Sequence, residues 1–319
     1  MIPPGRRLRI KLSTSFPEWP VEQQLPGGGT SWGNVDFFIN QPVEECDAWF
    51  VYDGITIEDS TLCPVGGVIF VTAEPSSFKC YNQGWLRSFD LVITSQHDLR
   101  HPVVTHTQTG LPWLLRRSFD ELLPFPSVPK TGDLSVISST KTTTRGHRQR
   151  LAFVRELARQ VPVEVFGRGF RSLEDKWDGL APFRFSIAIE NSQHVHYWTE
   201  KFADCVLAGT IPVYHGCPNI QEYFASDAFI PLDIFDVPAA VRTVKNLIAH
   251  GEAEYKQRLH ALHEARRRVL HEYNLFNLIA QAAATCVDAA RQRAKRTISP
   301  EPHPSWMWKK WLKMRRKWL

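Results

Sequence analysis

The 319-residue sequence predicts an α/β fold in which two doubly wound domains face each other across a cleft. Two series of short apolar segments, each ending in turn or polar residues, are typical of strands buried in parallel sheets. Helical patterns alternate with the strand patterns, most clearly in the second series. A chain of this length also favours about two domains.

The first series lies in a predicted N-terminal domain at residues 1–125. Its strands are LRIKLS, AWFVYDG, GVIFVTAEP and FDLVITS. The stretch FPEWPVEQQLPGGGTSWG is expected to be a loop. Its PGGGT segment lacks the Lys-Ser/Thr pair and the flanking strand and helix of a phosphate-binding P-loop, so we expect a turn there. Residues 122–133 contain three prolines and are the best candidate for a linker to the second domain.

The second series lies in a predicted domain at residues 126–285. It begins with a helix in HRQRLAFVRELARQ, followed by the strands VPVEVFG, FRFSIAIEN and TIPVYHG. Between the last two strands, Thr199 can cap a helix that ends at Gly209. The pattern is helical from about residue 237 to about 296, and residues 286–319 form a predicted helical tail rich in basic and aromatic residues.

Composition excludes several classes of protein. The sequence has no run of about 18 apolar residues, and its N-terminus is too polar for a signal peptide, so we expect a soluble, cytoplasmic protein. The six cysteines lack CxxC spacing, which predicts reduced thiols that are mostly buried. The net charge of +5 is concentrated in residues 305–319, which hold six basic residues and no acidic one. The rest of the chain is not basic, so no nucleic-acid partner is expected.

Four polar residues surround the predicted helix start after FRFSIAIEN: Asn191, Tyr197, Glu200 and Lys201. Doubly wound sheets bind ligands at the carboxyl ends of their strands, where helix N-termini attract anions. A cation in the first helical turn costs roughly 0.3–1 kcal/mol unless an anion lies nearby. A phosphate would reverse that sign at Lys201, and Glu200 could accept hydrogen bonds from a ribose. Two interpretations stay open: a nucleotide-sugar site, or a surface helix start with an incidental Glu-Lys pair.

The pattern FSIAIENS…YWTEKFADCVLAGTIPVYHGCPN…FI resembles the donor-binding signature of the α-1,3/1,4-fucosyltransferases, family 10 of the glycosyltransferases. Glu-Asn-Ser, Thr-Glu-Lys and Gly-x-Ile-Pro-Val occur in the order of that family. The resemblance covers residues 150–236 well and residues 68–118 more loosely. It implies a GT-B fold with two Rossmann-like domains, and an inverting enzyme that uses GDP-L-fucose as donor and requires no cofactor.

The resemblance also implies a role for each candidate residue in the donor site. Lys201 and Arg150 would bind the diphosphate, and Glu200 would bind the ribose. Asn191 and Tyr197 would make further donor contacts. Negative charge grows on the β-phosphate as GDP departs, and the two cations would stabilise that charge.

Arg150 and Glu74 are assigned from shorter stretches. RLAFVREL reproduces the helix start of the family with Arg150 as its first residue, although Arg145 and Arg148 lie close by. In VIFVTAEPSSF, Glu74 corresponds to the general base that takes the proton of the acceptor hydroxyl. Such a base contributes a factor of about 10²–10⁴ to the rate.

No metal site is predicted. The sequence has no Asp-x-Asp motif, and the spacing of His194, His196 and His215 does not suggest a third ligand. His215 and Trp198 occupy positions where the family has other residues, so the donor sugar and the acceptor stay open. The alternatives are a transferase that uses another GDP-sugar for surface polysaccharide, and a non-catalytic membrane-surface or nucleic-acid-binding protein that retains the fold.

The C-terminal sequence SWMWKKWLKMRRKWL separates two kinds of residue on a helix. One face holds Trp308, Trp311, Leu312, Trp318 and Leu319, and the other holds Lys309, Lys310, Lys313, Arg316 and Lys317. Such a helix is typical of a membrane interface with anionic lipid. We expect association with the inner face of the membrane and an oligosaccharide or glycolipid acceptor. Alternatively, the tail folds back and buries its tryptophans against the catalytic domains.

Overall fold

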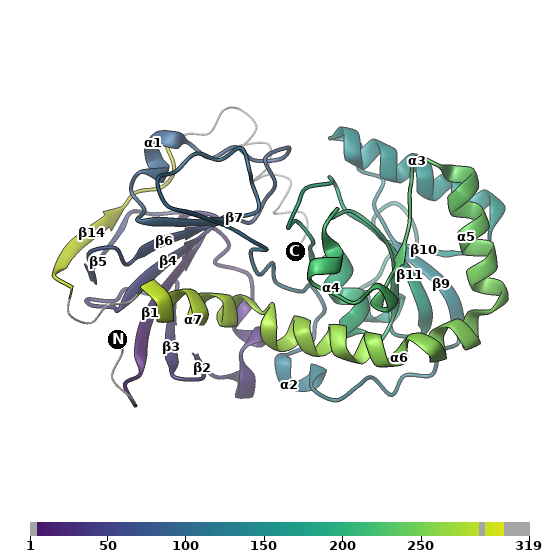
Figure 1. The fold of residues 1–319 in the computed structure, drawn as a ribbon, viewed down its shortest axis with the longest axis horizontal. Coiled ribbons are helices and arrows are strands. Elements are labelled where there is room, and N and C mark those ends of the chain that lie inside the picture. Colours follow the sequence, from purple (N-terminus) through teal and green to yellow (C-terminus); the bar gives the residue numbers. More distant parts are fainter. Residues whose placement is uncertain (1–4, 287–290, 303–319) are drawn as a thin grey trace. The chain divides into compact units, whose positions relative to one another are not determined.

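The computed structural model describes residues 5–286 and 291–302, and the chain divides into two compact units (Figure 1). Unit 1 consists of Met1–Pro20, Gly29–Thr109 and Leu278–Leu319, and unit 2 consists of Val21–Gly28 and Gly110–Asn277. These limits differ from the predicted boundaries after residues 125 and 285. The chain passes into unit 2 earlier than predicted, and residues from Leu278 onward belong to unit 1, whereas the prediction gave residues 286–319 as a separate tail.

Unit 1 is built on a sheet with the strand order β2-β3-β1-β4-β6-β7-β8, which is parallel except for β2. The strands are β1 (Leu8–Thr14), β2 (Ser31–Trp32), β3 (Val35–Ile39), β4 (Ala48–Tyr52), β6 (Val68–Val71), β7 (Leu91–Thr94) and β8 (Val104–His106). Every residue of β4 and β6 is buried, as expected for central parallel strands. The four predicted strands correspond to β1, β4, β6 and β7.

The core of unit 1 is rich in aromatic side chains. The ring of Phe70 packs against those of Tyr81, Trp85 and Phe89, with centroid distances of 5.0, 5.0 and 4.9 Å. Trp85 lies in the short helix α1 (Gln83–Leu86). These contacts fix the chain that follows β6 against the sheet.

The last described segment of the chain is a strand. β14 (Arg293–Ile298) pairs antiparallel with β5 (Asp59–Pro64) in unit 1. Arg293 also pairs with the buried carboxylate of Asp47 at 2.9 Å. The prediction of helix through residue 296 is therefore wrong here, because pairing with β5 outweighs the local helical propensity. Residues 303–319, including the predicted membrane-binding tail, lie outside the described residues.

Unit 2 contains a parallel sheet with the order β10-β9-β11-β12-β13. Its strands are β9 (Gly132–Ile137), β10 (Glu164–Phe166), β11 (Phe183–Ile189), β12 (Ile211–His215) and β13 (Ile230–Pro231). The helices are α2 (Phe119–Leu122), α3 (Arg145–Gln160), α4 (Glu200–Leu207), α5 (Val237–Ala249), α6 (Gly251–Arg267) and α7 (Leu275–Cys286), which continues into unit 1. As predicted, Thr199 caps α4, and Gly209, with a φ of 68°, follows its end.

The crossovers of unit 2 lead to opposite faces of the sheet. The β9–α3–β10 connection runs to one side of β9, and the β11–α4–β12 connection runs to the other. Right-handed crossovers therefore place α3 and α4 on opposite faces. Figure 1 shows α3 and α5 on one side of the strands and α4 on the other.

The segment predicted as a linker is anchored to unit 2. Arg266 on α6 is buried and donates hydrogen bonds to the backbone carbonyls of residues 122–124. Asp204 on α4 accepts a hydrogen bond from the backbone N–H of Leu114 at 2.9 Å. These bonds satisfy buried polar groups on both sides, which explains why residues 110–126 belong to unit 2.

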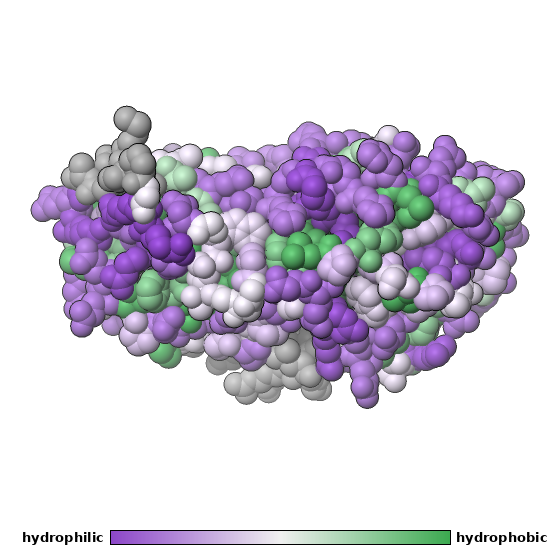
Figure 2. All heavy atoms as spheres, turned by 90° about the horizontal axis from the view of Figure 1, so that it is seen from below, coloured by the Kyte–Doolittle hydropathy of each residue, from purple (hydrophilic) through white to green (hydrophobic). Residues whose placement is uncertain are grey.

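The surface is largely polar. Hydrophilic side chains predominate on the face drawn in Figure 2, and apolar side chains form small groups among them. Within the described ranges, no helix combines the length and the apolar character needed to cross a membrane. All six cysteines are free, and four of them are buried, as predicted: Cys46, Cys63, Cys205 and Cys217.

Candidate functional site

The candidate residues of unit 2 lie near the point at which the strand order of its sheet reverses. β9 has β10 on one side and β11 on the other, and the crossovers after β9 and β11 diverge from this point. Doubly wound sheets bind ligands here, beyond the carboxyl ends of the strands. Ser138 and Ser139 follow β9 at this edge, and Glu190 and Asn191 follow β11.

The N-terminus of α3 borders the same point. The hydroxyl of Thr144 caps the helix by accepting a hydrogen bond from the His147 backbone N–H at 3.1 Å. Gly146, in the first turn, lies so close to the residue after β11 that a Cβ would be 1.9 Å from the Asn191 carbonyl oxygen. The lack of a side chain at residue 146 therefore permits α3 to start against β11.

Arg150 connects α3 with the chain after β11 and the chain after β9. Its Nη1 donates to Asn191 Oδ1 at 2.7 Å, and its Nη2 donates to Ser139 Oγ at 3.4 Å. The residue is 6% exposed, and its Nε–H has no hydrogen-bond partner among the described residues. Burial lowers the pKa of Arg150, and the fields of Glu190 and Glu200 oppose this effect. A buried guanidinium held directly by neutral acceptors and with an unused donor favours an anionic ligand.

At the start of α4, a buried carboxylate organises the chain. Glu190 accepts hydrogen bonds from the Thr199 N–H at 2.9 Å and from the Thr199 hydroxyl at 2.8 Å. The ammonium of Lys201 lies 3.3 Å from Glu190 Oε2 and 3.0 Å from Glu200 Oε1. Lys201 is thus compensated by two carboxylates, whereas Arg150 is not paired directly with either.

The protonation of this cluster follows from its burial and its charges. Burial disfavours the charged form of Lys201, but Glu200 and Glu190 outweigh it and raise the pKa of Lys201. Burial alone would raise the pKa of Glu200, but the charges of Lys201 and Lys176 outweigh this effect and lower that pKa. Burial raises the pKa of Glu190 against the opposing effect of Lys201. Lys201 and Glu200 are therefore both charged near neutral pH.

Further cations surround Arg150. Burial, reinforced by Arg168 and Arg150, lowers the pKa of Lys141 to about 8. Burial, reinforced by Arg150, Lys141 and Lys201, lowers the pKa of His147 to about 4, so this imidazole is neutral at pH 7. The mutual repulsion of Lys141, Arg150 and Arg168 marks a region of positive potential that attracts anions.

Tyr197 lies in the loop between β11 and α4, and it is only 4% exposed. The loop is held by Asn219, whose Oδ1 accepts a hydrogen bond from the His196 backbone N–H at 2.8 Å. His196 has a φ of 64°, and its Nδ1 lies 2.6 Å from the hydroxyl of Tyr223. These bonds hold a left-handed conformation that residues other than glycine rarely adopt. The contact of Tyr197 with the donor stays a prediction.

Glu74 lies in unit 1, apart from the five candidate residues of unit 2. It occupies a bend three residues beyond the end of β6 and is half-buried. Its backbone carbonyl accepts a hydrogen bond from Gln96 Nε2 at 2.7 Å. The structure therefore places Glu74 beyond the carboxyl end of a central strand, and its role as the general base stays a prediction.

Glu190 was missed by sequence reasoning, although it connects Thr199 with Lys201. A signal was present, because Glu190 directly follows the apolar strand β11. Glu74, which was assigned from the family resemblance, also follows an apolar strand. Lys141 gave no such signal, because a lysine in the polar stretch KTTTRGHRQR resembles any solvated residue.

The histidines predicted not to bind metal make other contacts. His215 Nδ1 lies 2.9 Å from the carbonyl oxygen of Leu232, and His196 contacts Tyr223. In the part of the chain that the structure describes, no group of three or more His, Cys, Asp or Glu side chains is arranged to hold a metal ion.

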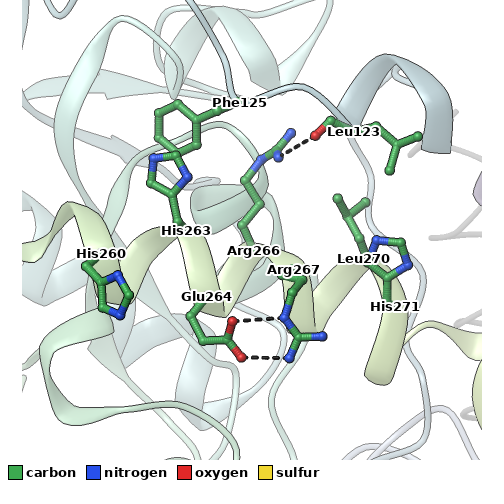
Figure 3. Close-up of a pocket in the computed structure, with 9 residues that line it drawn as sticks. All are labelled: Leu123, Phe125, His260, His263, Glu264, Arg266, Arg267, Leu270 and His271. Atoms are coloured by element: carbon green, nitrogen blue, oxygen red, sulfur yellow. Dashed lines mark hydrogen bonds and ion pairs between the residues drawn. The ribbon is translucent and has the colours of Figure 1, made fainter.

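A pocket beside α6 lies away from these residues (Figure 3). The ring of Phe125 stacks on His263 with a centroid distance of 3.8 Å. Arg267 pairs with Glu264 at 2.7 Å, and Arg266 bonds the backbone of the anchored segment. The charged groups of the pocket are thus engaged with the protein itself, and the pocket belongs to the anchor of residues 122–125.

The chain matches a family model described as Glycosyltransferase family 10 (fucosyltransferase) C-term over residues 129–299. Alpha-(1,3)-fucosyltransferase 7 of Rattus norvegicus is 28% identical over 198 residues, which are 57% of this chain and 52% of that protein. The protein of the same name in Homo sapiens is 31% identical over 170 residues, or 48% and 49% of the two chains. A crystal structure of an alpha1,3-fucosyltransferase has a TM-score of 0.50 at 20% identity, over 82% of each chain.

The chain spans about half the length of these two curated relatives. At 20% identity, the structural likeness concerns the fold alone, and it confirms the GT-B type with two Rossmann-like units. The family model covers more than half of the 319 residues and includes all five candidate residues of unit 2. The chain therefore belongs to glycosyltransferase family 10, the fucosyltransferase family.

Proposed function

We propose that this protein transfers L-fucose from GDP-fucose to a hydroxyl group of a glycan acceptor, with inversion at the transferred carbon. Family membership supports the reaction class and the donor. The cations beyond β9 and β11 support a diphosphate at the switch point of unit 2. The observation that carries the proposal is Arg150, buried at this point with an N–H that has no partner among the described residues.

Arg150 and Lys201 contribute to diphosphate binding in different ways. Lys201 already neutralises Glu190 and Glu200, so its net attraction for an added anion is reduced. Among the described residues, Arg150 donates hydrogen bonds to neutral oxygens of Asn191 and Ser139 and makes no direct contact with a carboxylate. A phosphate that meets Arg150 can use its spare donor or replace one of these contacts. We assign the larger share of diphosphate binding to Arg150.

The rest of the donor site follows from the same geometry. Glu200 remains ionised beside Lys201, so it can accept hydrogen bonds from the ribose hydroxyls. Asn191 and Tyr197 complete the donor contacts. As the glycosidic bond breaks, the electron pair stays on the β-phosphate oxygen, where the fixed cations stabilise the growing charge. Glu74 takes the proton of the attacking hydroxyl.

We also propose that the C-terminal tail attaches the protein peripherally to the inner face of a membrane. The amphipathic sequence of residues 305–319 supports this interpretation, and anionic lipid is the matching surface. An oligosaccharide or glycolipid at that surface would then be the acceptor.

The test combines calorimetry with a panel of donors. Arg150→Ala should weaken GDP binding by roughly tenfold to a hundredfold, since a charge-assisted hydrogen bond contributes about 1.5–3 kcal/mol. Lys201→Ala should weaken it less. Arg155→Ala is the matched control, because Arg155 is exposed on the same helix.

The donor panel compares hydrolysis of GDP-fucose, GDP-mannose and UDP-sugars by the purified protein. Preference for GDP-fucose supports the proposal, and preference for another GDP-sugar would replace fucose as the transferred sugar. GDP affinity that is unchanged in a folded Arg150→Ala protein would contradict the assignment of the diphosphate site.

A further inference from the structure

The C-terminal end of the described chain contacts the segment that carries Glu74. Beyond β14, the backbone carbonyl of Ser299 accepts a hydrogen bond from Trp85 Nε1 at 2.8 Å. Two residues later, Glu301 Oε1 accepts a hydrogen bond from the backbone N–H of Asn82 at 2.6 Å. Its other oxygen, Oε2, lies 3.9 Å from the ammonium of Lys79. Residues 299 and 301 thus contact the segment that follows β6, although they lie more than 200 positions further along the chain.

The two side chains of the Lys79–Glu301 ion pair are buried. The side chains of Glu301 and Lys79 are 7% and 6% exposed. Burial raises the pKa of Glu301 against the opposing effects of Lys79 and the Asn82 amide. Lys79 also donates to the backbone carbonyl of Asp53 at 2.8 Å. A carboxylate in such a place costs free energy unless its partners compensate it, so this contact fixes both segments.

The same network reaches Glu74 through one amide side chain. Gln96 Nε2 donates to the backbone carbonyl of Glu74 at 2.7 Å and to that of Lys79 at 2.9 Å. Gln96 therefore ties the two ends of the turn 74–79 together. Glu301 supports the far end of this turn at Asn82 and beside Lys79. It shares this task with Asp53, whose carboxylate lies 3.3 Å from the Lys79 ammonium. Gln96 connects this end of the turn with Glu74.

We propose that Glu301 is a positioning residue for Glu74. The C-terminal return of the chain through β14 carries Glu301 to the turn, and its carboxylate keeps the turn in the conformation that presents Glu74. The catalytic consequence depends on the proposed function, in which Glu74 is the general base. The ordering of residues 72–82 by Glu301 does not depend on the proposed function.

The test uses the full chain with Glu301→Ala and the more conservative Glu301→Gln. Glutamine keeps an acceptor for the Asn82 N–H and removes the charge that faces Lys79. Ser299→Ala is the matched control, because the Ser299 hydroxyl bonds Glu58 at 2.6 Å on the surface of the same segment. Hydrogen exchange of residues 72–82, GDP affinity and steady-state kinetics are measured for each protein.

We expect Glu301→Ala to speed amide exchange in residues 72–82 at least tenfold and to lower kcat at least tenfold. The GDP affinity should match that of the wild type, because the donor residues lie in unit 2. Glu301→Gln should have an amide-exchange rate and a kcat between those of the wild type and Glu301→Ala. If the alanine variant does not fold, the glutamine variant provides the test. Exchange no faster than in Ser299→Ala, or faster exchange with unchanged kcat, would overturn the proposal. Full activity of Glu74→Gln would instead overturn the base assignment and leave the ordering of the turn intact.

Discussion

Replacing Lys201 by methionine tests the charge arrangement at the start of α4. Methionine keeps an unbranched side chain of similar shape, with sulfur in place of Cδ, and lacks the ammonium group. In the native protein this group lies 3.0 Å from Glu200 and 3.3 Å from Glu190, and the Glu190 side chain has no exposed surface. The variant leaves two neighbouring carboxylates without the cation between them.

The size of the effect follows from burial. Removing one partner of a buried ion pair costs about 3–5 kcal/mol, but 21% of the Lys201 side chain is exposed and water screens part of the interaction. We therefore expect the free energy of unfolding to fall by roughly 2–3 kcal/mol at pH 7. The loss should come with a weaker affinity for GDP.

The effect should depend on pH with a defined sign. The pKa of Glu200 in the folded protein lies below its usual value of 4.5, mainly because Lys201 outweighs burial. Its stabilising contribution is therefore present above about pH 4.5 and is lost as the pH falls through the lower folded value. Without Lys201, both carboxylates protonate more easily, so the deficit of the variant should shrink between pH 7 and pH 4.

Urea unfolding monitored by tryptophan fluorescence at pH 7 and at pH 4 measures the loss of unfolding free energy and its dependence on pH. Lys256→Met is the control, because Lys256 pairs with Glu252 at 2.6 Å but both side chains are more than 60% exposed. Its loss should stay below about 1 kcal/mol. A loss below about 1 kcal/mol in Lys201→Met, or an equal loss at both pH values, would refute the reasoning.

Three further predictions concern other parts of the molecule. Glu74→Gln should leave GDP affinity unchanged in calorimetry and cut fucosyl transfer at least ~10²-fold, and full transfer would show that another group takes the proton. Gly146→Ala should destabilise the protein in thermal unfolding although alanine favours helices, since its Cβ would lie 1.9 Å from the Asn191 carbonyl oxygen; a stabilised variant would mean that α3 can shift. Deletion of residues 305–319 should spare transfer to soluble acceptors and abolish salt-sensitive sedimentation with anionic vesicles, and the membrane interpretation is wrong if the shortened protein still sediments or unfolds.

Local patterns determined much of the fold. Strands β4, β6 and β7 were predictable because parallel strands buried on both faces are nearly continuously apolar. β1 was predictable from its apolar residues Leu8, Ile10 and Leu12, although Arg9 and Lys11 alternate with them. The limits of α4 were predictable because Thr199 and Gly209 act through their own backbone neighbours. Strands β2, β3, β5, β8, β9 and β13 were not predicted, since their pairing depends on residues distant in the sequence.

Tertiary structure decided what local patterns could not. The sequence 293–298 has helical propensity, yet it forms a strand because β5 offers it partners. The segment rich in proline is anchored because Arg266 reaches it from α6, a contact that no local pattern encodes.

The candidate site divides in the same way. The residue types and spacing from Asn191 to Lys201 indicated a nucleotide-sugar site from the sequence, because helix capping and charge at a helix start act within a few residues. The pairing of Lys201 with Glu190 and the burial of Arg150 depend on the arrangement of β9, β11 and α3, which brings residues up to 41 positions apart within 3.4 Å of one another. Electrostatic interactions follow distance in space, so only the tertiary structure could decide that Lys201 is paired with two carboxylates whereas Arg150 has no direct carboxylate partner among the described residues.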